Sequence, residues 1–279
     1  MKNIHVLFCL LLTVGTALFS INLIAQSATG KWKGKKTAVV LTYDDALNVH
    51  LDKVIPLLDS LKLRGSFYLS GYFPGCRDRI KDWRKAAEVG HELGNHTMFH
   101  PCLGDGPGRD WVKGERKMEN YSIQRMSEEI KMNNILLSAI DGKTKRTFAY
   151  PCGDTRIHDT AYLDMKDFVA ARGTKPKSVD IAQIDLSDIS CTSIMNQSGT
   201  QLINQVKRAI TDGDLLVFLF HGVGGEHAIN VSEEAHRELV YFLKQHENEI
   251  LILPMVEIAE HIENYQQVRK SNKQVQKTK

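Results

Sequence analysis

The alternation of short apolar runs with helix-like segments is the feature that most constrains this fold. The clearest run covers residues 215–220, LLVFLF, and a β-branched run covers residues 37–43. Continuous apolar runs of this length are typical of strands that are buried on both faces, as in parallel sheets. Long amphipathic segments such as residues 122–140 separate the runs. The alternation therefore predicts an α/β fold with a largely parallel sheet.

The number of such units indicates the architecture. The expected strands are 37–43, 66–69, 92–96 (a short strand or a turn), 147–150, 168–171, 215–220 and 250–253. The expected helices are 48–63, 80–89, 122–140, 160–166, 200–210, 232–246 and 258–262. This many units favours a distorted or incomplete (β/α) barrel, with an open doubly wound sheet as the alternative. No glycine fingerprint follows the first strand, which counts against dinucleotide binding.

The two ends of the chain differ from the middle. Residues 1–27 are predicted to be a secretory signal peptide, because an apolar stretch ends in small residues. An uncleaved membrane anchor is the alternative, since the stretch approaches the ~20 residues of a spanning helix. We therefore expect a secreted or periplasmic protein, or one anchored at its N-terminus. Residues 28–36 are predicted to be a linker, 37–266 one domain, and 267–279 a basic, disordered tail.

The net charge of +3 does not describe the domain. Ten basic residues lie in segments 1–36 and 267–279, which contain no acidic residue, and subtracting them from +3 leaves residues 37–266 at −7. The charge pattern therefore gives no indication of a nucleic-acid partner. Nothing in it implies a protein partner either.

Four cysteines remain after removal of the signal segment: Cys76, Cys102, Cys152 and Cys191. In an exported protein they permit two disulfides in three connectivities, and free buried thiols are equally compatible with a domain of this size. The absence of a CxxC pair counts against a structural zinc site.

Unusual polar residues follow three of the expected strands. Asp44 and Asp45 end the first, His96 and His100 follow the third, and His221 follows the run at 215–220. Active-site groups of parallel α/β folds gather at these carboxyl ends. Taken singly, an Asp pair is more often a turn or helix cap, an HxxxH spacing is mostly chance, and a lone His is usually structural. Together they predict one site, since one carboxylate and two imidazoles commonly hold a catalytic divalent ion.

The same residues resemble the motifs of the polysaccharide deacetylases, the family with the NodB homology domain. The TYDDA sequence at 42–46 resembles the TFDDG motif, and residues 96–100 match H-[ST]-x-x-H. The YPCG sequence at 150–153 resembles the end of RxPxG, and LFH at 219–221 matches LxH. The motifs occur in the family's order, and the resemblance covers about residues 37–262.

The resemblance implies a division of roles between the two acids. Asp44 would be the general base, whereas Asp45, His96 and His100 would bind a divalent metal, most often Zn²⁺ and in some members another ion. A carboxylate outside the ligand set is free to take a proton from the attacking water.

Further roles follow from the other two motifs. The resemblance implies that the backbone N–H of Cys152 stabilises the oxyanion, and such a donor contributes roughly 3–4 kcal/mol. It implies that His221 protonates the leaving group. Tyr150 and Pro151 are expected to contact the substrate.

The sequence departs from the family pattern in two places. The Arg of RxPxG, which orients the base, is Ala149 here, and the DxxDW motif is not recognisable. Near its expected position lies Arg172, which either replaces the missing arginine or is an ordinary surface residue. Asp185 or Asp188 would be available to partner His221.

The function that the resemblance implies is metal-dependent removal of acetyl groups from a carbohydrate. The first expectation is an N-acetyl amino sugar of a chitin-like, peptidoglycan or surface glycan. An O-acetyl esterase acting on a xylan-like polysaccharide is the close alternative, and a non-catalytic glycan-binding relative is an alternative of another class. Aromatic residues near loops are candidates for a sugar-stacking cleft: Tyr72, Phe73, Trp83 and Trp111.

Overall fold

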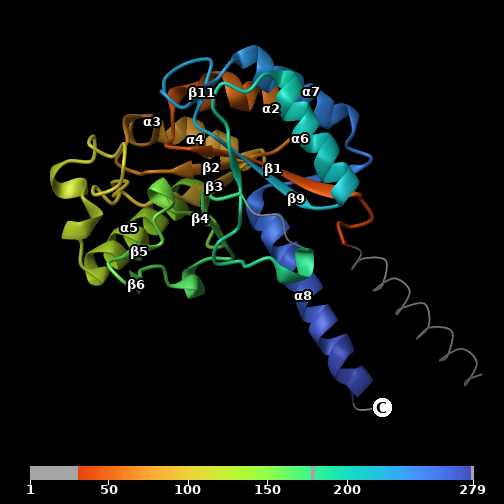
Figure 1. The fold of residues 1–279 in the computed structure, drawn as a ribbon. Helices are drawn as coiled ribbons and strands as arrows, with labels where there is room; N and C mark the ends of the chain where they lie inside the picture. Colours follow the sequence, from red (N-terminus) through yellow and green to blue (C-terminus); the bar gives the residue numbers. More distant parts are fainter. Residues whose placement is uncertain (1–30, 177–179, 278–279) are drawn as a thin grey trace, which may run out of the picture.

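A parallel eight-stranded sheet forms the centre of the computed structural model, which describes residues 31–176 and 180–277 (Figure 1). Its strands are β1 (Thr37–Asp44), β2 (Ser66–Leu69), β3 (Glu92–Asn95), β4 (Phe148–Ala149), β7 (Ala171–Arg172), β8 (Thr192–Ser193), β9 (Leu215–Phe220) and β12 (Ile250–Ile252). The order is β7-β4-β3-β2-β1-β9-β8, and β12 pairs with the first residues of β1.

The sheet curls into a half-barrel. A parallel bridge joins Arg172 of β7 to Ile189, and the chain continues from Ile189 into β8 at the other end of the strand order. The outermost strands, β7 and β8, are thus connected through an irregular segment and are not directly paired. The prediction of a distorted or incomplete (β/α) barrel is confirmed.

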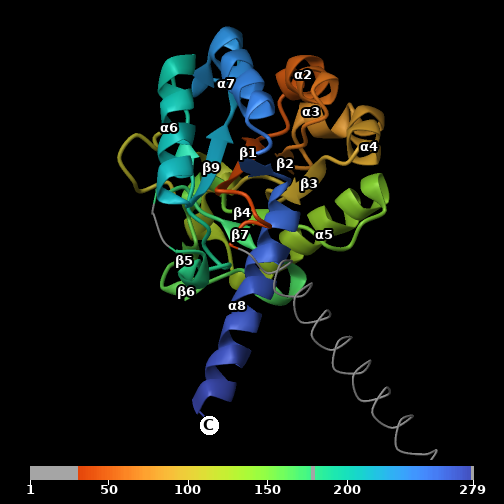
Figure 2. The same ribbon diagram turned by 90° about the vertical axis from the view of Figure 1, so that its right-hand side faces the viewer.

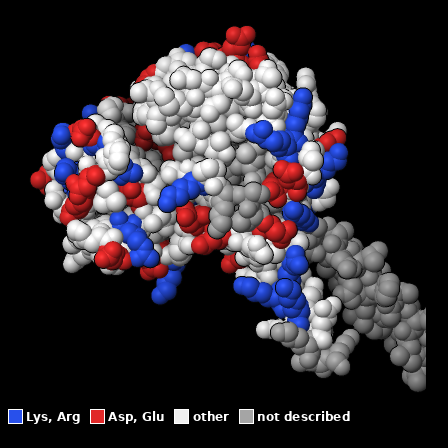
Figure 3. Space-filling view, in the orientation of Figure 1, with Lys and Arg blue, Asp and Glu red and all other residues white. Residues whose placement is uncertain are grey.

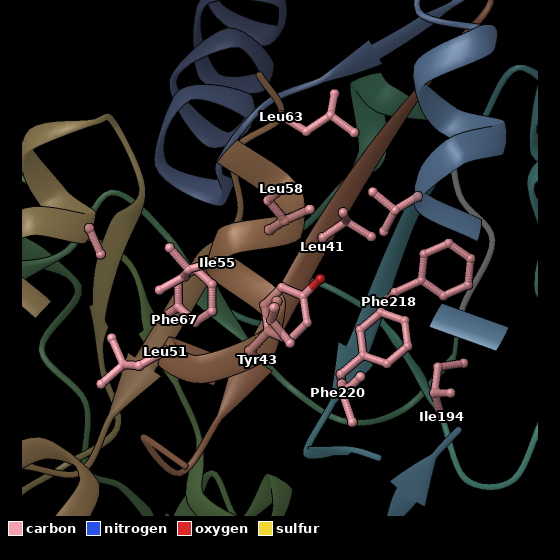
Figure 4. Packing of buried hydrophobic residues seen from close by; sticks show 14 of the residues in the cluster. Leu41, Tyr43, Leu51, Ile55, Leu58, Leu63, Phe67, Ile194, Phe218 and Phe220 are labelled. Carbon is pink, nitrogen blue, oxygen red and sulfur yellow. The ribbon is translucent and has the colours of Figure 1, made fainter. Parts of the chain in front are cut away.

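Helices cover the outer face of the sheet. The elements α2 (Ile55–Ser60), α4 (Ile80–Glu88), α5 (Ile123–Asp141), α6 (Gly199–Asp212) and α7 (Glu233–Gln245) lie in an arc around the strands (Figure 2). Outward-pointing strand residues such as Leu41, Phe67 and Phe218 pack with Leu58 of α2 in the largest apolar cluster (Figure 4). Successive strand residues point to opposite faces, so the intervening residues point into the half-barrel.

The inner face carries both apolar and polar side chains. Val40 and Leu219 contact the first turns of α8 (Met255–Lys277), including Ile258. The buried Glu92 carboxylate accepts hydrogen bonds from the Ser66 hydroxyl, Thr147 and the backbone N–H of Val256. The inner face therefore also holds a buried polar network, which is centred on Glu92 at the start of β3.

Short elements complete the chain. They are α3 (Pro74–Arg77), the hairpin β5 (Arg156–Ile157) and β6 (Thr160–Ala161), the pair β10 (Gly222–Val223) and β11 (Asn230–Val231), a π-helical turn at His50–Val54, and 3₁₀ turns at Gly114–Arg116, Met118–Asn120, Pro151–Gly153, Met165–Asp167 and Ile181–Gln183. The helix expected at 160–166 is wrong, because its residues form β6 and a turn in which the Asp164 side chain accepts from the Lys166 N–H. The strand expected at 168–171 begins later, at Ala171.

Both predicted end segments differ in the structure. Residues 31–36, expected as a linker, pack on the domain, because the buried Trp32 donates from its indole N–H to the Gly213 carbonyl at 2.8 Å. Residues 267–277, expected as a disordered tail, continue α8, since they contain no Gly or Pro. Lys and Arg side chains gather along this projecting end (Figure 3).

The predicted signal peptide lies outside the described residues. Within 31–176 and 180–277, no helix has the length and apolar character that crossing a membrane requires.

Candidate active site

A sharp turn at the end of β1 presents the two acidic residues. Asp44 is the last strand residue, and Asp45 and Ala46 follow with φ angles of 78° and 53°. This left-handed region is strained for residues other than glycine. Gly75 passes close to the turn, where a Cβ atom would lie 1.9 Å from the Ala46 carbonyl oxygen. The close passage requires glycine at this position, and it fixes the turn from outside.

Asp45, His96 and His100 form a compact ligand set. Asp45 Oδ1 lies 3.6 Å from His96 Nε2 and 3.4 Å from His100 Nε2. The three ligand atoms all lie within 4.8 Å of one another. Asp45 Oδ1 is buried and has no hydrogen-bond partner among the described residues. Such an oxygen beside two imidazoles fits a divalent cation, which would satisfy it.

The imidazole of His96 is oriented for this role. Its Nδ1 donates to the Ala149 carbonyl oxygen at 2.8 Å, which leaves the lone pair of Nε2 facing Asp45. His96 and His100 are four residues apart, but they lie on a loop rather than on a helix. The loop is held by Asn95 Oδ1, which accepts from the Thr97 N–H, and by Thr97 Oγ1, which accepts from the His100 N–H.

The electrostatics of this set favour a charged carboxylate. Burial by itself would raise the pKa of Asp45, but the surrounding histidines outweigh it and lower that pKa from 3.8 to about 2. Burial lowers the pKa of His96 to about 4, although Asp44 opposes the shift. At neutral pH the site therefore combines an anionic oxygen with a neutral imidazole, the protonation states in which both groups bind metals.

Asp44 is held by a buried arginine. The Nη2 atom of Arg172 donates to Asp44 Oδ1 and Oδ2 at 2.7 and 2.5 Å. Arg172 comes from β7, is fully buried, and lies over the ring of Tyr68. Burial would lower the pKa of its guanidinium, but the Asp44 carboxylate outweighs this and raises it. The interpretation of Arg172 as a surface residue is thus excluded. Its guanidinium contacts Asp44, as expected if Arg172 replaces the missing arginine of the RxPxG motif.

His221 follows β9 and lies on the other side of Asp45. Its Nε2 is 4.0 Å from Asp45 Oδ2, and His50 Nε2 fixes its backbone by a 2.8 Å hydrogen bond to the His221 carbonyl oxygen. His221 Nδ1 is buried and lacks a hydrogen-bond partner among the described residues, so neither Asp185 nor Asp188 bonds to it. Burial lowers the pKa of His221.

The loop that carries Cys152 is tied to the histidine loop. Cys152 has a φ of 57° and forms a disulfide with Cys102, whose Sγ is 3.6 Å from His100 Nδ1. Arg109 also holds this loop, because its Nη2 donates to the Cys152 carbonyl oxygen at 3.2 Å. Of the pairings left open by the sequence, one disulfide is present, and Cys76 and Cys191 are buried free thiols.

Several expected substrate contacts do not fit the structure. Tyr150 is buried and donates its hydroxyl to the Ser187 carbonyl oxygen, and Pro151 is also buried. Trp83 is fully buried as well, in the apolar cluster under the helices. These side chains support the core instead of lining a cleft.

Two aromatic residues lie closer to the ligand set. The Phe73 ring is 5.8 Å from that of His100, and the exposed Tyr72 contacts Phe99, with ring centroids 5.2 Å apart.

The sequence analysis missed His227. Its Nε2 lies 3.8 Å from Asp45 Oδ2, and its ring stacks on that of His221 with centroids 4.8 Å apart. His227 belongs to the loop between β10 and β11, where no family motif points to it. A signal was present in the sequence, since His227 follows His221 by six residues in a glycine-rich segment, but that spacing has no fixed structural meaning.

Comparisons with known proteins agree with this geometry. A family model described as polysaccharide deacetylase matches residues 31–168. The chain is 26% identical over 104 residues to the peptidoglycan-N-acetylmuramic acid deacetylase PdaA of Bacillus subtilis, covering 37% of this chain and 38% of that protein. It is 31% identical over 99 residues to a chitooligosaccharide deacetylase of Sinorhizobium fredii, covering 35% and 45%. The alignments thus span less than half the length of either relative.

A solved structure gives the same fold over more of the chain. A Mycobacterium smegmatis protein assigned to the polysaccharide deacetylases superposes with a TM-score of 0.60, covering 83% of this chain and 91% of that one. The sequence identity is 16%, so this likeness concerns the fold alone.

Proposed function

This chain belongs to the polysaccharide deacetylase family, and from that premise we propose that it is a metal-dependent hydrolase of N-acetyl groups on amino sugars. The substrate class is a chitin-like, peptidoglycan or surface glycan. Asp45, His96 and His100 are the proposed ligands of a divalent ion, Zn²⁺ by preference, because one carboxylate and two imidazoles suit it.

One observation carries the proposal of catalysis. Asp44 lies next to the ligand set, with its Oδ2 3.8 Å from His96 Nε2, and both of its carboxylate oxygens accept hydrogen bonds from the buried guanidinium of Arg172. Burying the ion pair of Asp44 and Arg172 away from water costs free energy. A pair at this cost, next to the proposed metal ligands, supports a functional role for Asp44. A module that only binds glycans has no use for a fixed, charged base at this place.

The proposed chemistry assigns one step to each group. A bound divalent ion would polarise the acetyl carbonyl and favour deprotonation of the attacking water. Asp44 accepts the proton from that water, and Arg172 keeps the carboxylate in position. The backbone N–H of Cys152 donates to the carbonyl oxygen as negative charge develops there. His221 returns a proton to the departing amine.

The test is acetate release from a panel of glycans. We expect release from a chitin oligosaccharide or from peptidoglycan, loss after treatment with a chelator, and recovery on addition of Zn²⁺. Release from acetylated xylan alone would replace the amide substrate with an ester. Glycan binding without any acetate release, by a metal-loaded protein, would contradict catalysis and favour a binding module.

A further inference from the structure

The loop that carries His227 is hydrogen-bonded to residues 48–49, which follow the turn with Asp44 and Asp45. The Glu226 carboxylate accepts hydrogen bonds from the Asn48 side chain and from the Val49 N–H, each at 2.7 Å. The Gly225 N–H donates to Asn230 Oδ1 at 3.0 Å, which closes the loop on itself. His227 is therefore held at a defined place beside the turn that presents Asp44 and Asp45.

Asp45 lies between two pairs of histidines. Its Oδ1 faces His96 and His100, whereas its Oδ2 faces His221 and His227 at 4.0 and 3.8 Å. The two pairs differ in exposure. The His96 side chain is 2% exposed and that of His227 is 31% exposed, so His227 lies at the solvent side of the site.

Local hydrogen bonds give His227 and His96 opposite tautomers. The backbone N–H of Ile229 donates to His227 Nδ1 at 3.0 Å, and the Ile229 carbonyl oxygen is farther away at 3.3 Å. Because an N–H cannot accept, Nδ1 must hold a lone pair, and the neutral ring carries its proton on Nε2. In His96, Nδ1 is the donor and Nε2 holds the lone pair.

A ring that directs an N–H towards the site is not prepared to bind a metal through that atom. The 3.8 Å from His227 Nε2 to Asp45 Oδ2 is also too long for a hydrogen bond. The Nε2–H of His227 thus points into the site without forming a hydrogen bond to Asp45, and it lies on the side that is open to solvent. A ligand oxygen bound next to His221 would be within its reach, because the two rings are stacked.

We propose that His227 binds the substrate, with Nε2–H donating to an oxygen of the sugar unit that carries the acetyl group. The inference rests on the proposed function for the identity of the ligand. Its two structural parts, the Nε2–H tautomer and the absence of a metal bond, do not depend on turnover. The acceptor chemistry is that of a sugar hydroxyl or an amide carbonyl, both of which accept from an imidazole N–H.

The kinetic test compares His227→Leu with His227→Gln. Leu removes the donor, and Gln keeps an N–H₂ donor of similar reach. With tri-N-acetylchitotriose we expect the Leu variant to raise KM about tenfold, the effect of one lost hydrogen bond, and the Gln variant to stay within about threefold of the parent. We expect kcat to change less than KM in both. The same replacement at the end of α7, His246→Leu, is the matched control and should change neither constant.

Metal affinity and nitrogen NMR provide readouts besides activity. A chelating dye should give the same Zn²⁺ dissociation constant, within about threefold, for the parent and the Leu variant. In ¹⁵N-histidine spectra of the metal-free protein, His227 should show the Nε2–H tautomer and His96 the Nδ1–H tautomer. A Zn²⁺ affinity that falls more than about tenfold, an Nδ1–H tautomer for His227, or an unchanged KM in the Leu variant would each overturn the proposal. If the parent releases no acetate, the proposed function fails, while the dye and NMR results still decide the tautomer and the metal bond.

Discussion

The outer and inner faces of the sheet are built by alternate residues of the same strands, but the candidate site with its charged side chains lies on the inner side only. On the outer face Leu41, Phe67 and Phe218 are fully buried under helices. On the inner face Tyr68 and Arg172 are just as deeply buried, but they are polar and lead to the acids. Burial alone therefore does not identify the stabilising core. The outer face supplies the largest apolar cluster, and its contacts help to support the costly polar groups of the inner face.

Five residues with strained backbone angles lie around the candidate site. Asp45, Ala46, Thr97, His100 and Cys152 all have φ angles between 53° and 78°, and all lie in the segments that follow β1, β3 and β4. Two helices of the outer face begin conventionally. Ser198 and Ser232 cap α6 and α7, and Gly213 ends α6 in the left-handed region. Around the site, local backbone preferences are thus overridden where the side chains must meet.

The largest expected effect comes from the inner face. Asp44→Asn should lower kcat by about 10²–10⁴-fold, because the variant loses its general base. Zn²⁺ affinity should stay within about threefold of the parent, since Asp44 is outside the proposed ligand set. Acetate release and titration with a chelating dye measure the two quantities. An Asn variant that works at the parent rate would remove Asp44 from the mechanism.

Loss of the charge also affects folding. Asp44→Asn leaves the buried Arg172 without its anion, which costs about 3–5 kcal/mol. The double variant Asp44→Asn/Arg172→Met removes both charges and should recover much of the unfolding free energy, but none of the activity. Denaturant unfolding of the single and double variants separates a catalytic loss from a folding defect.

The outer face should show the opposite behaviour. Leu41→Ala removes a fully buried side chain from the apolar cluster and should lower the free energy of unfolding by about 2–5 kcal/mol. Activity per folded molecule should not change. Denaturant unfolding and the acetate assay at low temperature check both statements, and a large loss of kcat in folded Leu41→Ala would break the separation between the two faces.

The regular elements could be predicted because each follows one clear pattern. The strands at 66–69 and 215–220 have the predicted bounds, since their apolar runs are flanked by Gly and polar residues. Prediction was wrong at 160–166, where the side chain of Asp164 competes with a helix for the backbone. The extension of α8 was missed because charge composition was taken as a sign of disorder, although residues 267–277 contain helix-forming types.

The site was predictable as far as its motifs extend. Asp44, Asp45, His96 and His221 all lie where the strand ends placed them. The contact between Arg172 and Asp44 was only one of two alternatives, because residues 128 apart in sequence meet through the curl of the sheet. His227 could not be found, since its position depends on a loop that Glu226 attaches to a distant segment. Long-range geometry of this kind has no local sequence pattern.

The Cys102–Cys152 disulfide joins the histidine loop to the turn that follows β4. It links segments 50 residues apart, so removing it should lower the free energy of unfolding by about 2–4 kcal/mol. Cys102→Ala/Cys152→Ala is the suitable variant, because replacing Cys152 alone would free a thiol beside His100. Activity should fall by less than about 100-fold, or 2.7 kcal/mol, since the proposed oxyanion donor is a backbone N–H. A greater loss with an intact fold would assign a direct role to the sulfur atoms.

The smallest expected effect concerns a polar exception on the outer face. The Tyr43 hydroxyl and His236 Nε2 form a 2.8 Å hydrogen bond between β1 and α7. Burial lowers the pKa of His236 from 6.5 to about 3, so the ring stays neutral in the folded protein. In the unfolded chain the ring binds a proton below about pH 6.5. Its contribution to stability is therefore fully present above that pH, and it decreases as the pH falls from about 6.5 towards about 3.

His236→Gln should remove this dependence and keep a side chain that can bond to Tyr43. Between pH 6.5 and 5.5 the parent should lose about 1 kcal/mol more unfolding free energy than the variant. Urea unfolding of both proteins at the two pH values gives the double difference, in which protonation of His91 and of the metal site largely cancels. An equal loss in both proteins would mean that His236 is not held neutral. The hydrogen bond between Tyr43 and His236 would then make no pH-dependent contribution to stability.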